Sequence, residues 1–309
     1  MSRRSAPKGD DQPDLFFAAA FTDVPVRDQR DTMERPFFSL AKKPRKTPID
    51  YQVGDVFVRV SPNADYSIAT IWDADILIWA ATQITEAVDR GMNPAQVLNF
   101  HPYTLLRAIR RGTGGKDYER LKAAMHRLAA TYIVTNIRAP KSLARKGRGF
   151  HWLEDWGFHE DDNGAPVQMY MKVADWLYDG IKKDRIVLTI HEDYFLLTGG
   201  IERWLYRVAR KHAGSQEMGW QFTMRQLYEK SGSAARFSDF ALDVRKIVEG
   251  NNLPEYTLSL NTNNEGDEIV SMVRRSHLGV MDPQFEIPRH PRRRIAGGIT
   301  QKADRFTRA

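Results

Sequence analysis

Hydrophobic positions recur at helical spacing in three successive segments of the first half of the chain. The first segment, 72–90, carries an apolar stripe and ends before a glycine. The second, 102–112, begins with a proline, which suits the first position of a helix, and ends at a glycine. A glycine-rich turn separates it from the third segment, 116–130. The pattern predicts three helices with a tight turn between the last two.

The third segment separates an apolar face from a basic face on a helical wheel. The apolar face holds Tyr118, Leu121, Met125, Leu128 and Tyr132. The opposite face holds Lys116, Arg120, Ala123 and Arg127. A helix that packs by one side and is cationic on the other suits the major groove, because Arg and Lys reach phosphates and guanine edges there. Lys116, Arg120 and Arg127 are therefore candidate DNA contacts; the alternative is an ordinary solvated charged face.

A predicted hairpin follows this helix. The β-branched residues of 131–137 and the aromatic residues of 150–156 are typical of two strands joined by a polar loop. The loop and its ends contain five cations and no acid: Arg138, Lys141, Arg145, Lys146 and Arg148. Because these charges repel one another unless an anion neutralises them, we expect a wing that lies along the DNA backbone.

The same succession of elements returns from residue 201 onward. A leading helix, a short helix capped by Thr223 and a longer helix at about 234–249 precede two strands at 256–260 and 269–274. The candidate DNA contacts of this copy are Ser233, Arg236, Arg245 and Lys246. Acidic residues share the exposed side of the longer helix. This helix is therefore a weaker candidate for base contacts than the helix at 116–130.

Two copies of this plan predict an α+β fold with two tandem winged-helix domains and flexible N- and C-terminal tails. We place the domains at 34–183 and 184–281, with the boundary fixed to within about ten residues. Residues 1–33 are predicted to be a flexible tail, and residues 282–309 a second, basic one.

Overall charge and cysteine content narrow the classes of function. The net charge of +7 favours a polyanionic partner such as double-stranded DNA. The absence of cysteine excludes disulfides and thiolate metal sites and agrees with a cytoplasmic location. No apolar run is long enough for a membrane span or a signal peptide, so no membrane association is expected.

The motifs of the obvious enzyme classes are incomplete. Residues 112–117 lack the spacing and the Ser or Thr after lysine that a phosphate-binding P-loop needs. His159 and His191 each precede a glutamate, but no second histidine follows at the fourth position, as zinc proteases require. No two histidines have the spacing that a rolling-circle nickase uses to hold its metal. We therefore expect a non-enzymatic protein with no catalytic residue, no metal and no cofactor.

Several stretches of the chain resemble the replication initiator protein A family, the plasmid and TrfA-like initiators of Gram-negative bacteria. They are 69–75, 115–133, 176–178, 199–206 and 243–247, and the resemblance covers roughly 35–275. It implies two winged helices that bind repeated duplex sites, called iterons, at a plasmid origin, help open an AT-rich segment and recruit host replication proteins. It also implies dimers that repress the initiator's own gene, monomers that initiate, and no nucleotide hydrolysis.

A short motif in the N-terminal tail indicates one further partner. Residues 12–16, Gln-Pro-Asp-Leu-Phe, are similar to the pentapeptide by which bacterial proteins bind the DNA polymerase sliding clamp. In that mode Leu15 and Phe16 fill an apolar cleft while Gln12 hydrogen-bonds at its rim. Pro13 departs from the commoner leucine, and a chance match in a polar tail is the alternative.

These patterns together predict a plasmid replication initiator that binds origin repeats in duplex DNA and contacts the sliding clamp. A replicative helicase or its loader and a homodimer are further expected partners. The alternative is a winged-helix transcriptional repressor without a role in replication. An origin nickase is the enzymatic rival, and it would nick supercoiled origin DNA in the presence of magnesium. The sequence does not specify the bases that are read or the number of repeats.

Overall fold

The helices of the first half are arranged around one almost fully buried helix. The computed structural model describes residues 17–138, 147–162, 164 and 166–278. The helices of this half are α1 (Ala74–Asp89), α2 (Pro102–Ala108), α3 (Gly115–Ala130) and α4 (Asp175–Lys182). Because α1 carries apolar or small residues on nearly all sides, it is buried along most of its length and forms the centre of the core.

The described residues of the same half form two four-stranded sheets. The first has the order β1-β5-β9-β8 and consists of β1 (Phe17–Ala18), β5 (Val97–Phe100), β8 (Leu153–Glu160) and β9 (Pro166–Val173). The second has the order β3-β4-β6-β7 and consists of β3 (Ile49–Val53), β4 (Val56–Ser61), β6 (Tyr132–Thr135) and β7 (Arg148–His151). An aromatic cluster packs beside β7, where the Phe38 and Trp152 rings stack with centroids 4.9 Å apart and those of Phe150 and Trp176 with centroids 5.0 Å apart.

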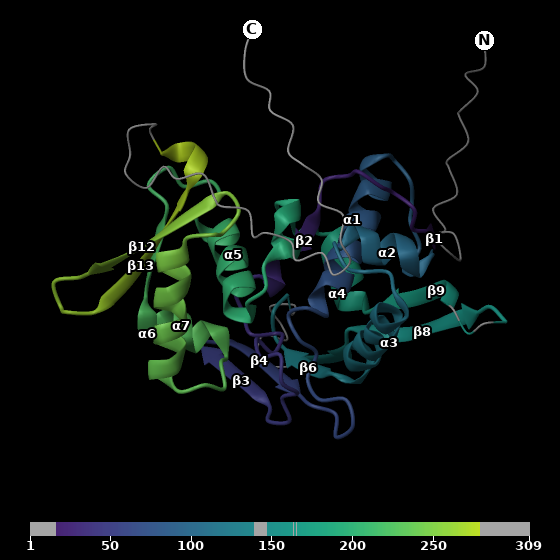
Figure 1. The fold of residues 1–309 in the computed structure, drawn as a ribbon, viewed down its shortest axis with the longest axis horizontal. Helices are drawn as coiled ribbons and strands as arrows, with labels where there is room; N and C mark the ends of the chain where they lie inside the picture. The colour runs from purple at the N-terminus through teal and green to yellow at the C-terminus, as the bar shows by residue number, and fades with distance from the viewer. Residues whose placement is uncertain (1–16, 139–146, 163, 165, 279–309) are drawn as a thin grey trace, which may run out of the picture.

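Up to residue 278, where the described part ends, the second half contains three α-helices and one three-stranded sheet (Figure 1, left). The helices are α5 (Gly200–His212), α6 (Met224–Ser231) and α7 (Phe237–Gly250). The antiparallel sheet has the order β11-β13-β12 and consists of β11 (Trp220–Thr223), β12 (Tyr256–Thr262) and β13 (Glu268–Arg274). Along the chain, one short 3-10 turn, η3 (Glu192–Leu196), precedes α5, and another, η4 (Arg275–His277), follows β13. Within the described ranges no helix is long and apolar enough to cross a membrane.

The two halves repeat one topology, as the sequence pattern predicted for the order of elements. In each half a strand between the first and second helices pairs with the last strand of a hairpin, giving β5-β9-β8 in one half and β11-β13-β12 in the other. The hairpin in the equivalent position of the first half is therefore β8 and β9. The predicted hairpin of β6 and β7 does form, with Ile133 opposite Phe150, but it is an insertion that joins β4 in the other sheet. The predicted strand at 150–156 is divided, because β7 ends at His151 and the following residues belong to β8 in the first sheet. Local periodicity predicts that a segment forms a strand, but it does not predict the neighbouring strand in the sheet. That neighbour is decided by contacts between residues that are distant in the sequence.

The prediction of a flexible tail up to residue 33 is wrong for residues 17–33. β1 pairs with β5, and β2 (Arg27–Gln29) pairs with β10 (Val187–Thr189) before a 3-10 turn, η1 (Arg30–Thr32). Asp28 is 2% exposed and Thr32 is 4% exposed. The polar composition of this segment suggested exposure, but Asp28 and Asp31 are buried against cations from distant parts of the chain. Residues 1–16 and the predicted tail 282–309 lie outside the described residues.

Buried ion pairs hold the two halves together across the predicted boundary near residue 184. Arg203 on α5 donates to Asp75 on α1 at 2.7 Å, and Arg207 on α5 donates to both oxygens of Asp28 at 2.7 and 3.0 Å. Strand β10, just after the boundary, pairs with β2 in the N-terminal segment. The segment that contains β2 and η1 is therefore a part of the interface between the two halves.

Candidate nucleic-acid interface

The start of α3 is set by a capping carboxylate and a glycine. The Asp117 side chain accepts a hydrogen bond from the backbone of Gly114 at 3.3 Å, which satisfies a donor that the helix itself leaves free. A Cβ added at Gly112 would collide with this carboxyl group. The glycine therefore leaves room for the cap, and the cap directs α3 out of the turn after α2.

The two faces of α3 separate as the sequence predicted, except at Tyr132 and at Arg127, which is partly buried. Leu121, Met125 and Leu128 are buried, whereas Lys116 and Ala123 are exposed and the Arg120 side chain is 73% exposed. Arg120 also pairs with Asp117 at 3.2 Å, one turn earlier on the helix. Tyr132 does not belong to the buried face, because it lies in β6 and is exposed.

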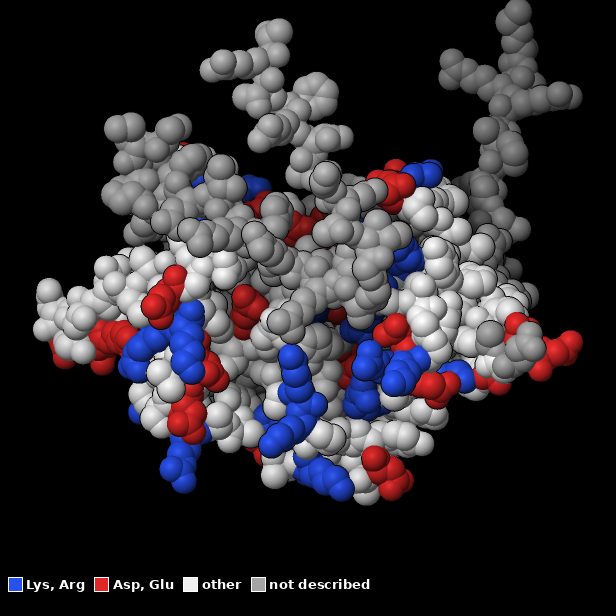
Figure 2. All heavy atoms as spheres, in the orientation of Figure 1, with Lys and Arg blue, Asp and Glu red and all other residues white. Residues whose placement is uncertain are grey.

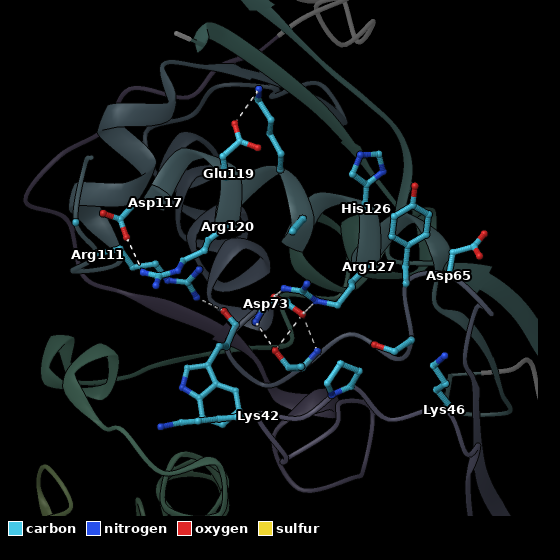
Figure 3. A pocket seen from close by; sticks show the side chains of 18 residues that line it. Lys42, Lys46, Asp65, Asp73, Arg111, Asp117, Glu119, Arg120, His126 and Arg127 are labelled. Carbon is cyan, nitrogen blue, oxygen red and sulfur yellow. Dashed lines mark hydrogen bonds and ion pairs between the residues drawn. The ribbon is translucent and has the colours of Figure 1, made fainter. Parts of the chain in front are cut away.

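An open groove of about 1040 Å³ runs along the exposed face of α3 (Figure 3). One wall is the basic loop 42–46, and the other contains the loop at 65–67. Residues that line it include Lys42, Lys46, Tyr66, Arg120, Ala123 and Arg127. The complete lining holds six cations and four acids, Asp65, Asp73, Asp117 and Glu119, so the groove has an excess of two positive charges next to the helix.

Arg127 is held inside this groove by a buried carboxylate. Its guanidinium donates to both oxygens of Asp73, at 2.8 and 2.7 Å, and Asp73 also accepts from the backbone of Thr70 at 2.8 Å. The hydrogen bonds to Asp73 raise the pKa of Arg127. Asp73 is 1% exposed and would be left as an uncompensated buried charge if Arg127 swung away. Arg127 thus has a structural partner, and its contact with DNA stays a prediction.

A row of aromatic rings closes one end of the groove. The Tyr66 ring stacks on His126 of α3 with centroids 4.8 Å apart, and the edge of His126 meets Trp156 of β8 at the same distance. Lys122 lies 4.6 Å from the centroid of Phe158 and pairs with Glu160, also on β8. These contacts fix the β8–β9 hairpin against the side of α3.

The structure describes only two of the five predicted wing cations, Arg138 and Arg148. Lys141, Arg145 and Lys146 lie outside the described residues. The two that are described are already paired with acids from outside the loop, whereas the sequence pattern predicted that DNA phosphates would neutralise them. Arg138 is 16% exposed, pairs with Asp31 at 3.0 Å and Asp184 at 3.3 Å, and lies 4.0 Å from the Trp176 ring centroid. Arg148, at the start of β7, pairs with Asp175 at 3.3 Å. Their acidic partners come from segments far away in the sequence, which a local count of charges does not detect.

The hairpin that occupies the equivalent position, β8 and β9, has an acidic end. Glu160, Asp161 and Asp162 follow one another where the two strands meet, and Figure 2 shows acidic side chains at this tip on the right of the molecule. Basic and acidic side chains are mixed over the lower half of the same face. The acidic tip would repel phosphates, so this hairpin does not take over the role predicted for loop 138–148.

In the second half the candidate contacts are partly neutralised. Arg236 is exposed at the start of α7, and Ser233 lies in the turn before it, where its hydroxyl accepts from the backbone of Ala235 at 3.2 Å. Arg245 of α7 donates to both oxygens of Glu268 on β13, each at 2.8 Å. Lys246 is exposed and lies 4.0 Å from Asp243.

The cations of loop 42–46 were missed in the sequence reasoning. The signal was present as a run without any acid, Ala-Lys-Lys-Pro-Arg-Lys-Thr at 41–47. It lay outside the predicted helices and hairpins, and only the fold brings it beside α3. Among the described residues no group of three or more His, Cys, Asp or Glu side chains could hold a metal ion.

Comparison with known proteins gives one family and one curated relative. The model of the family described as "Replication initiator protein A" matches residues 27–258. A protein of Wigglesworthia glossinidia brevipalpis described as "Putative replication protein" is 32% identical over 252 residues, which cover 80% of this chain and 89% of the relative. The segment matched by the family model contains α1 to α7 and ends before β13.

Two crystal structures of domains 2 and 3 of RctB have a similar fold. The first superposes with a TM-score of 0.57 at 12% identity, and the second with a TM-score of 0.50 at 11% identity. Each likeness covers 78% of this chain and 96% of the RctB chain. At such identities the likeness concerns the fold, a mixed α+β arrangement that extends over both halves.

Proposed function

Because the chain belongs to the replication initiator protein A family, we propose that it initiates plasmid replication by binding repeated duplex sites, or iterons, at the origin. Two winged helices would make the contacts, one in each half. The repeated order of strands, β5-β9-β8 and β11-β13-β12, supports two modules of this type. The insertion of β6 and β7 distinguishes the first module from the second.

The observation that carries this proposal is the exposed basic end of α3. Lys116 and Arg120 project from a helix whose other face is buried, and the exposed Arg120 side chain pairs with Asp117, a partly buried carboxylate one turn earlier. An exposed i, i+3 pair of this kind is weak, so a phosphate or a guanine edge can replace Asp117 at little cost. α3 is therefore proposed to read the major groove, with the wing cations 141, 145, 146 and 148 on adjacent phosphates.

The second module is proposed to make fewer contacts, through Ser233, Arg236 and Lys246. Arg245 would join them on release from Glu268. The buried ion pairs between the halves support a fixed separation of the two modules on one duplex. We propose that the protein acts in the cytoplasm, without catalysing a reaction, and that dimers repress its own gene.

Further proposed partners are proteins of the host replication machinery. The sliding clamp would bind Gln12, Leu15 and Phe16, and a replicative helicase or its loader would meet the initiator at the opened origin. The first of these proposals rests on the pentapeptide at 12–16 alone.

Competition binding tests the assignment of α3. Labelled duplex carrying the repeats next to the gene is displaced by unlabelled duplexes with single base-pair changes. Arg120→Ala is expected to lose about 1–3 kcal/mol of discrimination at one base pair, because a bidentate contact to guanine is removed. Arg59→Ala on β4, which removes an exposed arginine paired with Asp50 on β3, is the matched control and should leave the ranking of sites unchanged. The assignment is wrong if Arg120→Ala also leaves that ranking unchanged.

Plasmid maintenance tests the role in replication separately. The gene is supplied on a plasmid that carries the adjacent repeats and no other functional origin. Transformed colonies are expected with the wild-type gene. If specific binding is retained but no colonies form, the protein is a repressor and the proposed role in initiation falls.

A further inference from the structure

We propose that loop 42–46 is a phosphate-binding bridge that contacts the duplex backbone between the sites of the two modules. This inference rests on the proposed function, because it assumes that both modules engage one duplex. It assigns a binding role to Lys42, Lys43 and Lys46, and the ligand is the DNA phosphate group, independent of sequence.

The first support is that loop 42–46 carries several positive charges close together without an acidic partner in the described part of the chain. Four of the five residues 42–46 are cations, and the nearest acid along the chain is Asp50. Lys42, Lys43 and Lys46 are all exposed. Among the described residues Lys43 and Lys46 form no ion pair or hydrogen bond, and Lys42 lies 5.6 Å from the Trp72 ring centroid. Cations gathered in this way repel one another, and an anion that neutralises them is bound favourably.

The second support is that the loop is held in place without these lysines. Arg45, the one partly buried cation of the loop, donates to the carbonyl oxygens of Thr47 at 3.0 Å and of Pro48 at 2.9 Å. Its own carbonyl accepts from the backbone of Ile68 at 3.1 Å. Because Arg45 and the backbone fix the loop, the three lysines are free to bind a ligand, and little ordering entropy is lost when they do.

The third support is the position of the loop between the two modules. On one side Lys42 and Lys46 line the groove beside Arg120 of α3 (Figure 3). On the other side Arg45 donates to the carbonyl of Gly232 at 2.5 Å, in the turn that precedes α7. A Cβ added at Gly232 would also collide with Pro36, so the turn and the N-terminal segment are in close contact. A duplex that touches α3 and the turn before α7 would therefore pass over the loop.

The test is the salt dependence of duplex binding by the full-length protein. Each phosphate contact contributes about −0.9 to the slope of log affinity against log salt. Lys43→Ala/Lys46→Ala is expected to make the slope less steep by about two, on origin duplex and on random duplex alike. The Lys43→Arg/Lys46→Arg variant keeps both charges and should keep the slope. Lys172→Ala/Lys183→Ala, which removes two lysines paired with Glu154 and Asp179, is the matched control.

Replacing single phosphates by uncharged methylphosphonates tests where on the duplex the lysines bind. Methylphosphonates are placed either midway between the two module sites or at the outer flanks of the repeat. Central substitution should weaken the wild type and leave the Lys43→Ala/Lys46→Ala variant unaffected, whereas flanking substitution should weaken both proteins equally. An unchanged slope for the double alanine variant, or equal sensitivity of both proteins to the central substitution, overturns the bridge.

The outcomes separate this inference from the proposed function. If the wild type does not prefer origin repeats to random duplex, the proposed function fails. The slope can then still be measured on random duplex, because phosphate contacts do not depend on sequence. If the wild type binds no duplex in a salt-dependent way, both proposals are overturned.

Discussion

At the scale of single residues, buried carboxylates determine where several cations point. Glu34 is 6% exposed and accepts from Lys211 at 2.8 Å, His212 at 2.7 Å and Lys230 at 3.2 Å. Burial alone would raise the pKa of Glu34, but the hydrogen bond from His212 and the charges of the two lysines more than offset it. The pKa of Glu34 in the folded protein therefore lies well below its ordinary value.

This shift predicts a loss of stability in acid. A carboxyl whose pKa is lower in the folded than in the unfolded state stabilises the fold fully above the unfolded value, 4.5, and the stabilisation is lost as the pH falls below it. Glu34→Gln should lower the urea midpoint at pH 7 and flatten its decline between pH 5 and pH 3. The control Glu217→Gln changes an exposed glutamate and should retain the wild-type pH profile. An equally steep decline in Glu34→Gln would contradict the assignment.

At the scale of elements, α3 and α7 occupy equivalent positions but carry different charge. α3 has four basic residues, Lys116, Arg120, Lys122 and Arg127, against two acids. α7 has two basic residues, Arg245 and Lys246, against Asp239, Asp243 and Glu249. Glu268 on the neighbouring strand pairs with Arg245 as well. Equivalent topology therefore does not imply equivalent contacts, and α3 is the better candidate for the main helix in the groove.

The ion pair between Arg245 and Glu268 predicts that a single substitution increases the affinity for duplex DNA. Glu268→Gln removes the carboxylate that holds Arg245 and frees the arginine for a phosphate. Duplex binding should become tighter at low salt, with a slope of log affinity against log salt steeper by about one. Glu265→Gln removes the same charge from the exposed end of the hairpin, where no ion pair with Arg245 exists, and controls for net charge. Equal slopes for the two variants would show that Arg245 does not reach the duplex.

At the scale of the whole molecule, the N-terminal segment joins the two halves. Asp31 pairs with Arg138 of the first half, while Asp28 and Glu34 pair with Arg207 and Lys211 of α5. The aromatic cluster around Trp152 packs on the same segment through Phe38. Two modules joined through a third segment are expected to unfold together, because neither half buries all of its charged partners alone.

Breaking one of these pairs should therefore destabilise the entire chain. Asp28→Asn leaves Arg207 buried without its carboxylate and is expected to cost about 3–5 kcal/mol in the free energy of unfolding. Asp50→Asn breaks the exposed pair with Arg59 on β4 and should cost at most about 1 kcal/mol. Urea denaturation followed by tryptophan fluorescence and by circular dichroism measures both. A cost for Asp28→Asn no larger than the control would show that the pair does not join the halves.

The sequence by itself determined the helices α1–α3 and α5–α7, the strands β6, β7, β12 and β13, and the repeated order of these elements. These follow from local periodicity, as in Leu121, Met125 and Leu128 on one face of α3, and from glycines and caps at helix ends. It also determined the two-sidedness of α3 and the family resemblance, so that the basic end of the candidate site was predictable from residues 116 and 120 alone.

Only the tertiary structure decided which partners those elements and charges have. β6 joins β4 and not β9, Arg138 is paired with Asp31 and Asp184, Arg127 is held by Asp73, and loop 42–46 lies between the modules. Each of these contacts joins residues far apart along the chain. Local periodicity contains no information about such pairs, because strand pairing, burial and ion pairing depend on the distances that the complete fold creates.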